Sequence, residues 1–590
     1  MLLIRLALPL ICVLPSACRN VDSAWEDPIA RSAAGDGAPN VVVFVTDDQG
    51  IGDFSGSGHA LIRTPFLDQL AAWSPEVERF YVSPVCSPTR ASLMTGRWNY
   101  RTGVVDTWIG RSMMRPEERT LGEVWLRAGY ATGIFGKWHL GDCAPMRPQD
   151  QGFQEVLVHR GGGLAQPSEP PSNERRYSDP ILFHNGKPVQ VEGYCTDAYV
   201  DYALDFIDTA VEEGRPFLAC VTTNAPHDPY HDVPLEAYSQ VEQRWVAGGQ
   251  VPLVGNMERE LKIAAMVENI DRNVGRMLQH LEERGQLENT IFVFFNDNGP
   301  VGGRPAGALR GHKASVYEGG IRSPLWIHWP GQLLATTRVT QPMAHVDLLP
   351  TLAALCEIDA PLALDGRDFS GALRGEVNEV PERWLVLQSH RGNRPAFEHH
   401  FAVIGKRWKL VRASGFGRNA APASVPFELF DLNADPGETN NVALDYPEVV
   451  AGLRERYGRW YADVTAELDA EGRPSRILVG SDAEPETHLT LQDCYYSEGE
   501  GWRANSEGRW LLHVPAWTRF DVELLFREPV ELDSVRVWID GDSEARDGPR
   551  VGDRIPIGEL ELEAGPVDLG FDLAHAGVEV PLFQVVLRRH

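Results

Sequence analysis

Short apolar runs alternate with longer amphipathic stretches along the first two thirds of the chain. The apolar runs are rich in β-branched and aromatic residues. They predict four strands buried on both faces, at residues 41–45, 130–135, 217–221 and 291–295. Apolar positions recur with the helical period at residues 120–128, 199–212 and 261–281. This alternation predicts a doubly wound α/β domain with a mostly parallel sheet.

The pattern changes at about residue 381, where short alternating runs replace the alternation of strands and helices. Three runs predict an antiparallel sheet, at residues 384–388, 401–404 and 408–411. Residues 447–465 then predict a helix. We therefore expect a small α+β unit over residues 381–475, following the α/β domain over residues 40–380.

The last part of the chain shows strand-like alternation and no helical period. Representative segments are residues 510–514, 520–526 and 534–539. They predict an appended β-sandwich over residues 476–590. Sugar faces stack on exposed tryptophans, although buried sandwich tryptophans are the commoner arrangement. Four tryptophans of this region are Trp502, Trp510, Trp517 and Trp538.

The first 18 residues predict an export signal, because residues 1–14 are almost wholly apolar and Arg5 is their only charge. The segment is short for a membrane span. It ends in L-P-S-A-C, which resembles a bacterial lipoprotein cleavage box with Cys18 as the lipidated residue. The alternative is that the signal is cleaved after a small residue and Cys18 is not lipidated. Residues 19–39 suit a linker. We expect an exported protein, which is either periplasmic, a lipoprotein of the outer membrane or cell surface, or secreted.

The composition is that of an ordinary globular protein, with 43% hydrophobic and 23% charged residues. The formal net charge of −28 argues against nucleic acid as a partner. It also opposes the binding of an anionic ligand, so such a ligand would need locally clustered cations. The 8 cysteines are scattered, with no C-x-x-C pair and no zinc-ligand spacing, and their pairing stays open.

The most distinctive string is C-S-P-T-R-A-S-L-M-T-G-R, which begins at Cys86. Ser87 is a plausible N-cap, Pro88 suits the first helical position, and Gly96 can end the helix. Cys86 would then lie just before the helix start, facing free N–H groups that attract anions, with Arg90 as an added cation. The residues themselves allow either a reactive site or a buried, inert cysteine.

Acidic residues follow two of the predicted strands. Asp47 and Asp48 come directly after the first, and Asp297 and Asn298 after the last. Such residues can simply cap turns. Together they offer three carboxylates and an amide oxygen at one edge of a sheet. An all-oxygen set suits Ca²⁺ or Mg²⁺ better than zinc.

Five strings together resemble one family. The string at Cys86 matches the C-x-P-x-R signature of the type I sulfatases, which belong to the alkaline phosphatase superfamily. G-K-W-H-L-G at 136–141, N-A-P-H-D-P-Y at 224–230, the segment 311–322 and E-L-F-D-L-N-A-D-P-G-E at 428–438 also match. The chain is thus similar to arylsulfatase-like, formylglycine-dependent sulfatases over about residues 40–465, and the resemblance does not reach the last unit.

This resemblance implies a fold, a metal and a nucleophile. The fold would be alkaline-phosphatase-like, with residues 40–380 as the catalytic domain. One Ca²⁺ ion, with Mg²⁺ as the alternative, would be held by Asp47, Asp48, Asp297, Asn298 and the modified Cys86. A formylglycine-generating partner enzyme would convert Cys86 to formylglycine (3-oxoalanine), whose hydrate is a gem-diol. One hydroxyl of that gem-diol would attack the sulfur of the ester.

The resemblance also implies the roles of the remaining site residues. Arg90, Lys137 and Lys313 would supply fixed positive charge. Asp297 would act as base on the attacking hydroxyl, and Lys313 and His227 would assist the departing alcohol. His139 would deprotonate the second hydroxyl and expel sulfate. Within segment 311–322, Glu318 and Arg322 are expected to be structural.

The function expected is hydrolysis of a sulfated carbohydrate, such as a polysaccharide, or of an aryl sulfate. One alternative is a phosphate or phosphonate monoester hydrolase of the same superfamily. Another is a glycan-binding surface lipoprotein that uses the last unit. The sugar, its linkage and the sulfate position stay open, and residues 161–185 are a candidate wall of the substrate pocket.

Overall fold

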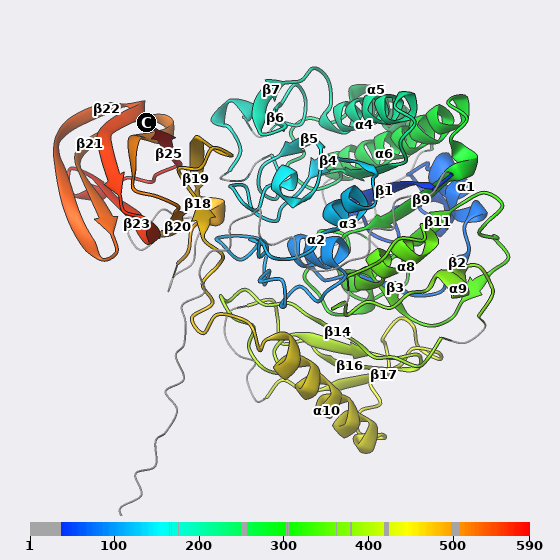
Figure 1. Ribbon diagram of the computed structural model, residues 1–590. Helices are drawn as coiled ribbons and strands as arrows, with labels where there is room; N and C mark the ends of the chain where they lie inside the picture. Colours follow the sequence, from blue (N-terminus) through cyan, green and yellow to red (C-terminus); the bar gives the residue numbers. More distant parts are fainter. Residues whose placement is uncertain are drawn as a thin grey trace, which may run out of the picture.

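The structure is a computed structural model (Figure 1). It describes residues 37–590 except 165, 167, 175, 249–256, 303, 305, 362, 378–379, 418–423 and 497–507. The predicted signal with Cys18, most of the predicted linker, and Trp502 lie outside the described residues. None of the described helices combines the length and the apolar character that crossing a membrane requires.

The core of the molecule is a sheet of eight strands in the order β11-β9-β1-β8-β4-β5-β6-β7. Its five central strands, β9 to β5, are parallel, and the strands at both edges are antiparallel. All four strands predicted in this region are confirmed. The bounds are β1 Asn40–Thr46, β4 Ala131–Lys137, β5 Glu155–His159, β6 Ile181–His184, β7 Lys187–Gln190, β8 Phe217–Thr222, β9 Thr290–Asn296 and β11 Leu325–His328.

Helices cover both faces of this sheet, which explains why its central strands β1, β4, β8 and β9 are buried along their whole length. In β1, Val41 and Val43 pack into one core and Val42 and Phe44 into the other, because successive side chains point to opposite faces. The first face carries α2 Cys86–Thr95, α3 Leu121–Arg127, α8 Leu348–Leu355 and α9 Ser370–Leu373. The second carries α1 Pro65–Trp73, α4 Cys195–Glu212 and α6 Met257–Glu283, with α5 Leu235–Gly248 against α6.

The three helices predicted in this domain are confirmed as α3, α4 and α6. Thr120 caps α3 as one half of a capping box with Glu123, which is why that helix begins there. Five two-residue strands form small sheets beside the main one. They are β2 Glu76–Val77, β3 Phe80–Tyr81, β10 Arg322–Ser323, β12 Arg338–Val339 and β13 Met343–Ala344.

A second, four-stranded antiparallel sheet follows in sequence, as predicted. Its strands lie in chain order, and α10 Pro447–Val464 packs on one face of it. In Figure 1 this unit lies below the main sheet. The strands are β14 Leu385–Gln388, β15 Phe401–Ile404, β16 Trp408–Arg412 and β17 Glu428–Asp431.

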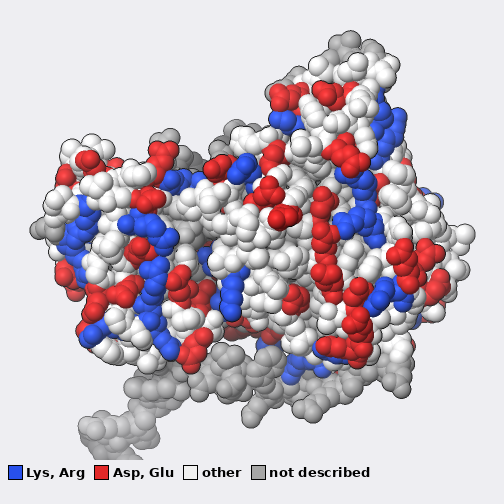
Figure 2. All heavy atoms as spheres, turned by 90° about the horizontal axis from the view of Figure 1, so that it is seen from above, with Lys and Arg blue, Asp and Glu red and all other residues white. Residues whose placement is uncertain are grey.

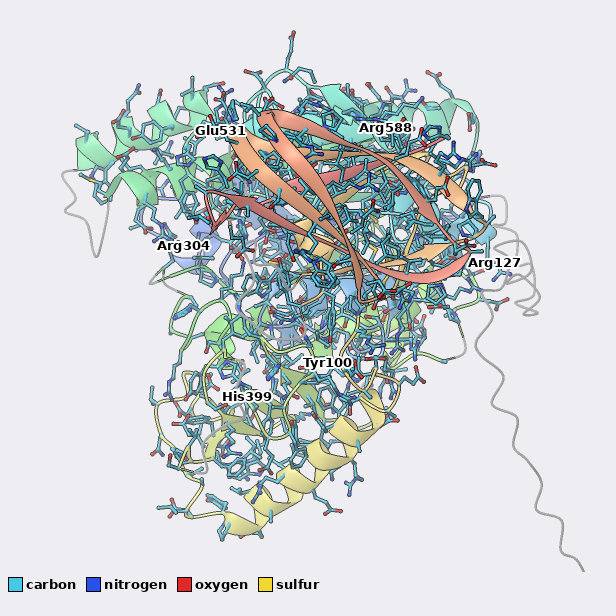
Figure 3. The ribbon with its side chains drawn as sticks, turned by 90° about the vertical axis from the view of Figure 1, so that its left-hand side faces the viewer. Tyr100, Arg127, Arg304, His399, Glu531 and Arg588 are labelled. Carbon is cyan, nitrogen blue, oxygen red and sulfur yellow. The ribbon has the colours of Figure 1, made fainter. Side chains whose placement is uncertain are left out.

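The last unit is all-β, as predicted, but two of its predicted strands are one. Residues 520–526 and 534–539 both belong to β21, which pairs with β25 in its first half and with β23 in its second. Register shifts let β21 bend between the two pairings. In Figure 3 this unit covers the upper part of the molecule. Its strands are β18 Ile477–Leu478, β19 Glu486–Thr490, β20 Trp510–Val514, β21 Thr518–Ile539, β22 Asp542–Leu562, β23 Gly565–His575, β24 Val578–Glu579 and β25 Gln584–Arg589.

A buried ion cluster joins the first two units. Lys409 of β16 is fully buried, and its Nζ lies 2.9 Å from Glu318 Oε1 and 2.8 Å from Glu438 Oε1. Arg322 pairs with the other oxygen of Glu318 at 2.6 Å. Glu318 and Arg322 therefore hold the second sheet against the segment that carries Lys313, which fits the structural role expected for them.

Replacing Lys409 by methionine should lower the free energy of unfolding by about 3–5 kcal/mol, because two buried carboxylates lose their shared cation. Urea denaturation measures this change. Arg459→Ala is the control, since Arg459 pairs with Glu455 on the exposed face of α10 and such a pair contributes about 0–1 kcal/mol. Equal stability of Lys409→Met and the unsubstituted protein would contradict the assignment.

Candidate active site

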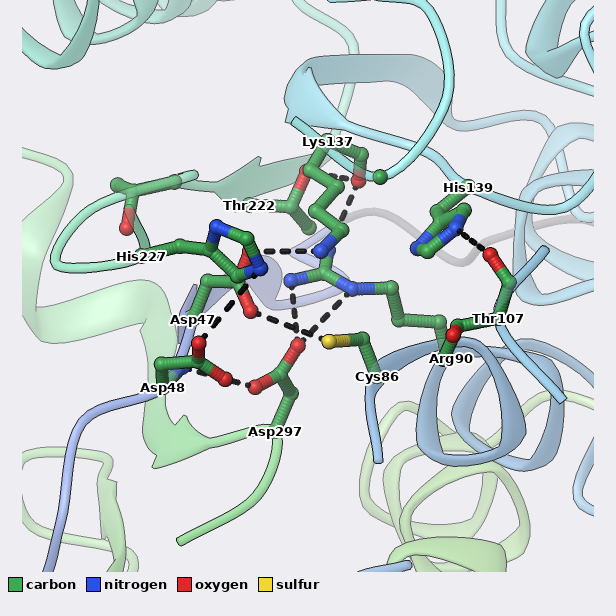
Figure 4. A network of polar contacts seen from close by, with 12 residues as sticks. Asp47, Asp48, Cys86, Arg90, Thr107, Lys137, His139, Thr222, His227 and Asp297 are labelled. Atoms are coloured by element: carbon green, nitrogen blue, oxygen red, sulfur yellow. Dashed lines mark hydrogen bonds and ion pairs between the residues drawn. The ribbon is translucent and has the colours of Figure 1, made fainter. Parts of the chain in front are cut away.

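Four adjacent parallel strands, β9, β1, β8 and β4, end at the same edge of the main sheet. Asp297 follows β9 directly, Asp47 and Asp48 follow β1, and Lys137 is the last residue of β4. His227 lies in the loop after β8. Open α/β sheets bind ligands at this edge. The topology thus brings these predicted residues into one network (Figure 4).

Helix α2 brings Cys86 and Arg90 to the same edge, but its predicted N-terminus is wrong. The helix begins at Cys86 itself, and Val85 is the N-cap with no side-chain hydrogen bond. Pro88 occupies the third helical position, where its missing N–H removes no intrahelical bond. Gly96 ends the helix with φ +65°, as expected. Cys86 therefore lies in the first turn, among free N–H groups.

Each of three buried carboxylates is paired with its own cation, of which Arg90 and Lys137 are buried and Lys313 is partly exposed. Lys137 Nζ lies 2.7 Å from Asp47 Oδ2, and Lys313 Nζ lies 2.6 Å from Asp48 Oδ1. Arg90 donates twice to Asp297 Oδ2, at 2.8 and 3.1 Å. Arg90 also donates to the carbonyl of Lys137 at 2.9 Å, which ties α2 to β4.

These pairings set the protonation of the acids. Burial would raise the pKa of Asp47, but Lys137, His227 and Arg90 hold it well below its usual value. Burial raises the pKa of Asp297 to about 6, and the neighbouring charge of Asp47 acts in the same direction. The carboxylate of Asp297 is therefore more basic than that of Asp47 at the same sheet edge.

Several oxygen atoms at this edge are suited to a hard cation. Asp48 Oδ2 and Asn298 Oδ1 are buried and accept no hydrogen bond from the described residues. Ligand atoms of Asp47, Asp48, Cys86 and His227 lie within 4.8 Å of one another. Buried oxygens without donors are a favourable environment for Ca²⁺ or Mg²⁺. Asp297 is not in that group, and its oxygens accept hydrogen bonds from Arg90 and from the backbone N–H of Asp48.

The thiol of Cys86 lies between opposite charges. Its Sγ is 3.4 Å from Asp47 Oδ1 and 3.4 Å from Lys313 Nζ. Burial, and then the charge of Asp47, raise the pKa of this thiol to about 12. The helix N-terminus does not yield a thiolate here, so an unmodified Cys86 would be a weak nucleophile.

The backbone fixes which ring nitrogen of each histidine is free. His139 Nε2 donates to the carbonyl of Thr107 at 2.7 Å, and its Nδ1 is buried without a partner among the described residues. Burial, and then the charge of Lys137, lower the pKa of His139 well below its usual value. His227 Nδ1 donates to the carbonyl of Asp228 at 2.6 Å, which leaves Nε2 toward Asp48 at 3.6 Å.

Three non-glycine residues of the site adopt the left-handed backbone conformation. They are Asp48 (φ +63°), His139 (φ +62°) and Ala314 (φ +66°), the last directly after Lys313. Such conformations cost about 1–3 kcal/mol each and persist where the surrounding structure enforces them. Their clustering indicates that the placement of these side chains compensates for the backbone strain.

A cavity of about 360 Å³ opens above these residues. Cys86, His139, His227 and Lys313 line it, whereas Arg90 and Lys137 lie beneath and are not among the described lining residues. None of the described lining residues is acidic. The molecular face in Figure 2 carries both signs of charge. The cavity is thus a local exception in a chain of net charge −28, as an anionic ligand would require.

One contact of the site comes from the appended all-β unit and has no signal in the sequence. Gln492, which is buried in the 3-10 turn Leu491–Asp493 after β19, donates to the carbonyl of Thr107 at 2.8 Å and to Ser112 Oγ at 3.0 Å. The same nitrogen lies 3.3 Å from His139 Nε2. The unit therefore supports the loop that orients His139.

Apolar packing reinforces this support. Trp108, Ile109 and Met113 of the same loop belong to the hydrophobic core of the all-β unit. Leu478 N also donates to the carbonyl of Ala144 at 2.8 Å. The last unit and the loops beside the cavity thus share one core.

Two family models match the chain. The sulfatase model matches residues 39–358, and the model described as the C-terminal part of N-sulphoglucosamine sulphohydrolase matches residues 311–460. Bovine arylsulfatase A is 31% identical over 517 residues, which span 80% of this chain and 96% of that protein. Porcine N-acetylgalactosamine-6-sulfatase is 29% identical over 73% of this chain and 88% of its own length.

Comparison with solved structures agrees with the family models and the sequence relatives. The crystal structure of Ps i-CgsB in complex with k-i-k-neocarrahexaose matches with a TM-score of 0.62 at 28% identity. The match covers 72% of this chain and 93% of the other. A phosphonate monoester hydrolase of Agrobacterium radiobacter matches with a TM-score of 0.52 at 20% identity, which shows a shared fold alone.

Replacing Gln492 by leucine should lower the free energy of unfolding by about 1–3 kcal/mol, because the buried Ser112 hydroxyl loses its donor. It should also shift the ring-nitrogen NMR resonances of His139. Gln240→Leu is the control, since Gln240 is exposed on α5 and its replacement should change stability by less than about 0.5 kcal/mol. Unchanged stability and unchanged His139 resonances in Gln492→Leu would refute this contact.

Proposed function

The chain belongs to the sulfatase family of the alkaline phosphatase superfamily and is a sulfuric ester hydrolase, and on that premise we propose its substrate class and its catalytic groups. The substrate is a sulfated carbohydrate, with aryl sulfates as small analogues. The nucleophile is a formylglycine formed from Cys86, beside one bound Ca²⁺ ion. The observation that supports this most strongly is the cavity without acidic lining residues, which has Cys86 and Lys313 in its wall.

The metal would be held by Asp47, Asp48, Asp297, Asn298 and the modified residue at position 86. The unpartnered oxygens of Asp48 and Asn298 support this assignment. A bound divalent cation supplies Lewis acidity and orients the sulfate oxygens. Lys137 and Arg90, which lie beneath the acids, hold the carboxylates in place before any ion binds.

Position 86 needs a better nucleophile than a thiol with a raised pKa. A hydrated formylglycine supplies a hydroxyl group at the place now taken by Sγ, and a formylglycine-generating partner enzyme would make it after synthesis. Lys313 Nζ and Asp47 Oδ1, both 3.4 Å from Sγ, would orient that group. Asp297, whose pKa is raised to about 6 by burial and by Asp47, suits the role of base.

Lys313 and the two histidines supply the remaining proton transfers. Burial would lower the pKa of Lys313, but the charge of Asp48 raises it well above its usual value, so the ammonium stays charged. It can therefore stabilise a departing alkoxide. His139 keeps Nδ1 free as a proton acceptor, and His227 presents Nε2 to the site. His227 thus joins Lys313 as the proposed donor to the leaving alcohol.

Names of the relatives support the substrate class. They include an N-acetylgalactosamine-6-sulfatase and a protein crystallised with neocarrahexaose. Of the described tryptophans in the last unit, Trp510 is buried and Trp538 donates to Asp572, whereas the exposed Trp517 is available to stack on a sugar. We further infer export, on the apolar segment before residue 18.

The Cys86 peptide from active protein should be about 18 Da lighter than cysteine predicts, because an aldehyde replaces the CH₂–SH group. Peptide mass spectrometry measures this, with the Cys356 peptide as the unmodified control.

Cys86→Ala and Cys86→Ser should lower the turnover of p-nitrophenyl sulfate at least about a thousandfold. Full activity with an unmodified Cys86 would exclude the proposed nucleophile. Faster hydrolysis of p-nitrophenyl phosphate would favour the phosphatase alternative.

Ca²⁺ at about one hundred times its Kd should stabilise the folded protein by about 2.7 kcal/mol, because it binds only the folded state. Thermal unfolding with and without Ca²⁺ measures this stabilisation. Asp48→Asn should remove most of it by deleting a ligand charge, and the exposed Asp445→Asn should retain it. A larger stabilisation by Zn²⁺ or Mn²⁺ would count against a calcium site.

A further inference from the structure

The cavity has a second cation that the proposed reaction does not use. Arg391 follows β14 in the second sheet unit and lines the same cavity as Cys86 and Lys313. Its guanidinium carbon lies 4.5 Å from the ring centre of Phe416 and 5.0 Å from that of Trp108. Aromatic rings interact with the faces of a guanidinium group and leave its N–H edge available.

The guanidinium group of Arg391 forms a long ion pair and donates no hydrogen bond among the described residues. Its side chain meets Asp106 Oδ2 at 3.9 Å, which is beyond hydrogen-bond distance, and it donates no hydrogen bond to another side chain or carbonyl in the described part of the chain. Asp106 Oδ2 is instead engaged by the indole N–H of Trp108 at 2.8 Å. Arg90 differs, since it donates to both Asp297 and Lys137. Arg391 is also 33% exposed, so a ligand can reach it.

The scissile sulfate already has its own cations. Lys313 touches Cys86 Sγ, and Lys137 and Arg90 lie beneath the same point. Arg391 comes from a different unit and is positioned by Trp108 and Phe416. His312 is exposed and also lines the cavity, and Asp106, the acid that Arg391 meets at 3.9 Å, is not among the described lining residues.

We propose that Arg391 binds a second anionic group of the substrate, a carboxylate or a further sulfate on the sugar that carries the scissile ester or on its neighbour. A guanidinium fork matches both groups, because each presents two oxygens in one plane. This inference rests on the proposed function. It makes Arg391 a specificity residue that selects doubly charged glycans.

The test uses p-nitrophenyl sulfate as the reporter and three disaccharides as competitors. The first is monosulfated with a uronate neighbour, the second is its carboxyl-reduced form, and the third is the reduced form with a second sulfate. Inhibition constants are obtained whether or not a competitor is cleaved. The unsubstituted enzyme should bind the first or the third at least tenfold more tightly than the second, and the preferred one identifies the anion.

Arg391→Gln should reduce that preference by about tenfold to hundredfold, the range for a hydrogen bond between charged groups. Arg391→Lys should retain part of it, and the effect should weaken as salt increases. Arg407→Gln is the matched control, since Arg407 lies over Trp408 at 4.4 Å in the same unit and does not line the cavity.

Two results would overturn the proposal. One is an unsubstituted enzyme that binds all three disaccharides equally, and the other is an Arg391→Gln variant that keeps the preference. Failure of the proposed function gives a different result, because the unsubstituted, matured enzyme would then hydrolyse neither p-nitrophenyl sulfate nor any sulfated disaccharide.

Discussion

The structure depends on three buried carboxylates at a single sheet edge, which are paired one to one with the buried Lys137 and Arg90 and the partly exposed Lys313. An unpaired buried carboxylate would be strongly destabilising, so each pair constrains the element that supplies its cation. Lys137 fixes the end of β4, Arg90 fixes helix α2, and Lys313 fixes the segment after β9. The acids thus define the site and also lock three separate parts of the chain around it.

The second sheet unit and the all-β unit add further constraints on the same site. Segment 311–322 carries Lys313 near one end and Glu318 near the other, and Glu318 is bound to Lys409 of the second sheet. The all-β unit acts on the opposite side, where Gln492 holds the Thr107 carbonyl that orients His139. The geometry of the candidate site is therefore built on the α/β domain but completed by residues from both other units.

Local sequence patterns predicted the parts of this arrangement that depend on local structure. Apolar runs located the buried strands, and Asp47 and Asp297 were found because they directly follow such runs. The prediction of Ser87 as the N-cap of α2 was wrong. Ser87 has the side chain typical of an N-cap, but the residue with the extended backbone before the helix is Val85. Gln492 and Arg391 could not be found this way. Their roles arise from packing between units hundreds of residues apart, and neither lies in a recognisable motif.

The same packing resolves the conflict between a net charge of −28 and an anionic substrate. Salt at physiological strength screens exposed charges beyond about 8 Å, so distant surface acids contribute little at the cavity. Nearby groups decide the local potential, and the described lining residues are cationic or neutral. The nearest acids are neutralised by Lys137, Arg90 and Lys313 before a ligand arrives. An acidic protein can therefore bind an anion, because its buried pairs leave the wall of the cavity positive.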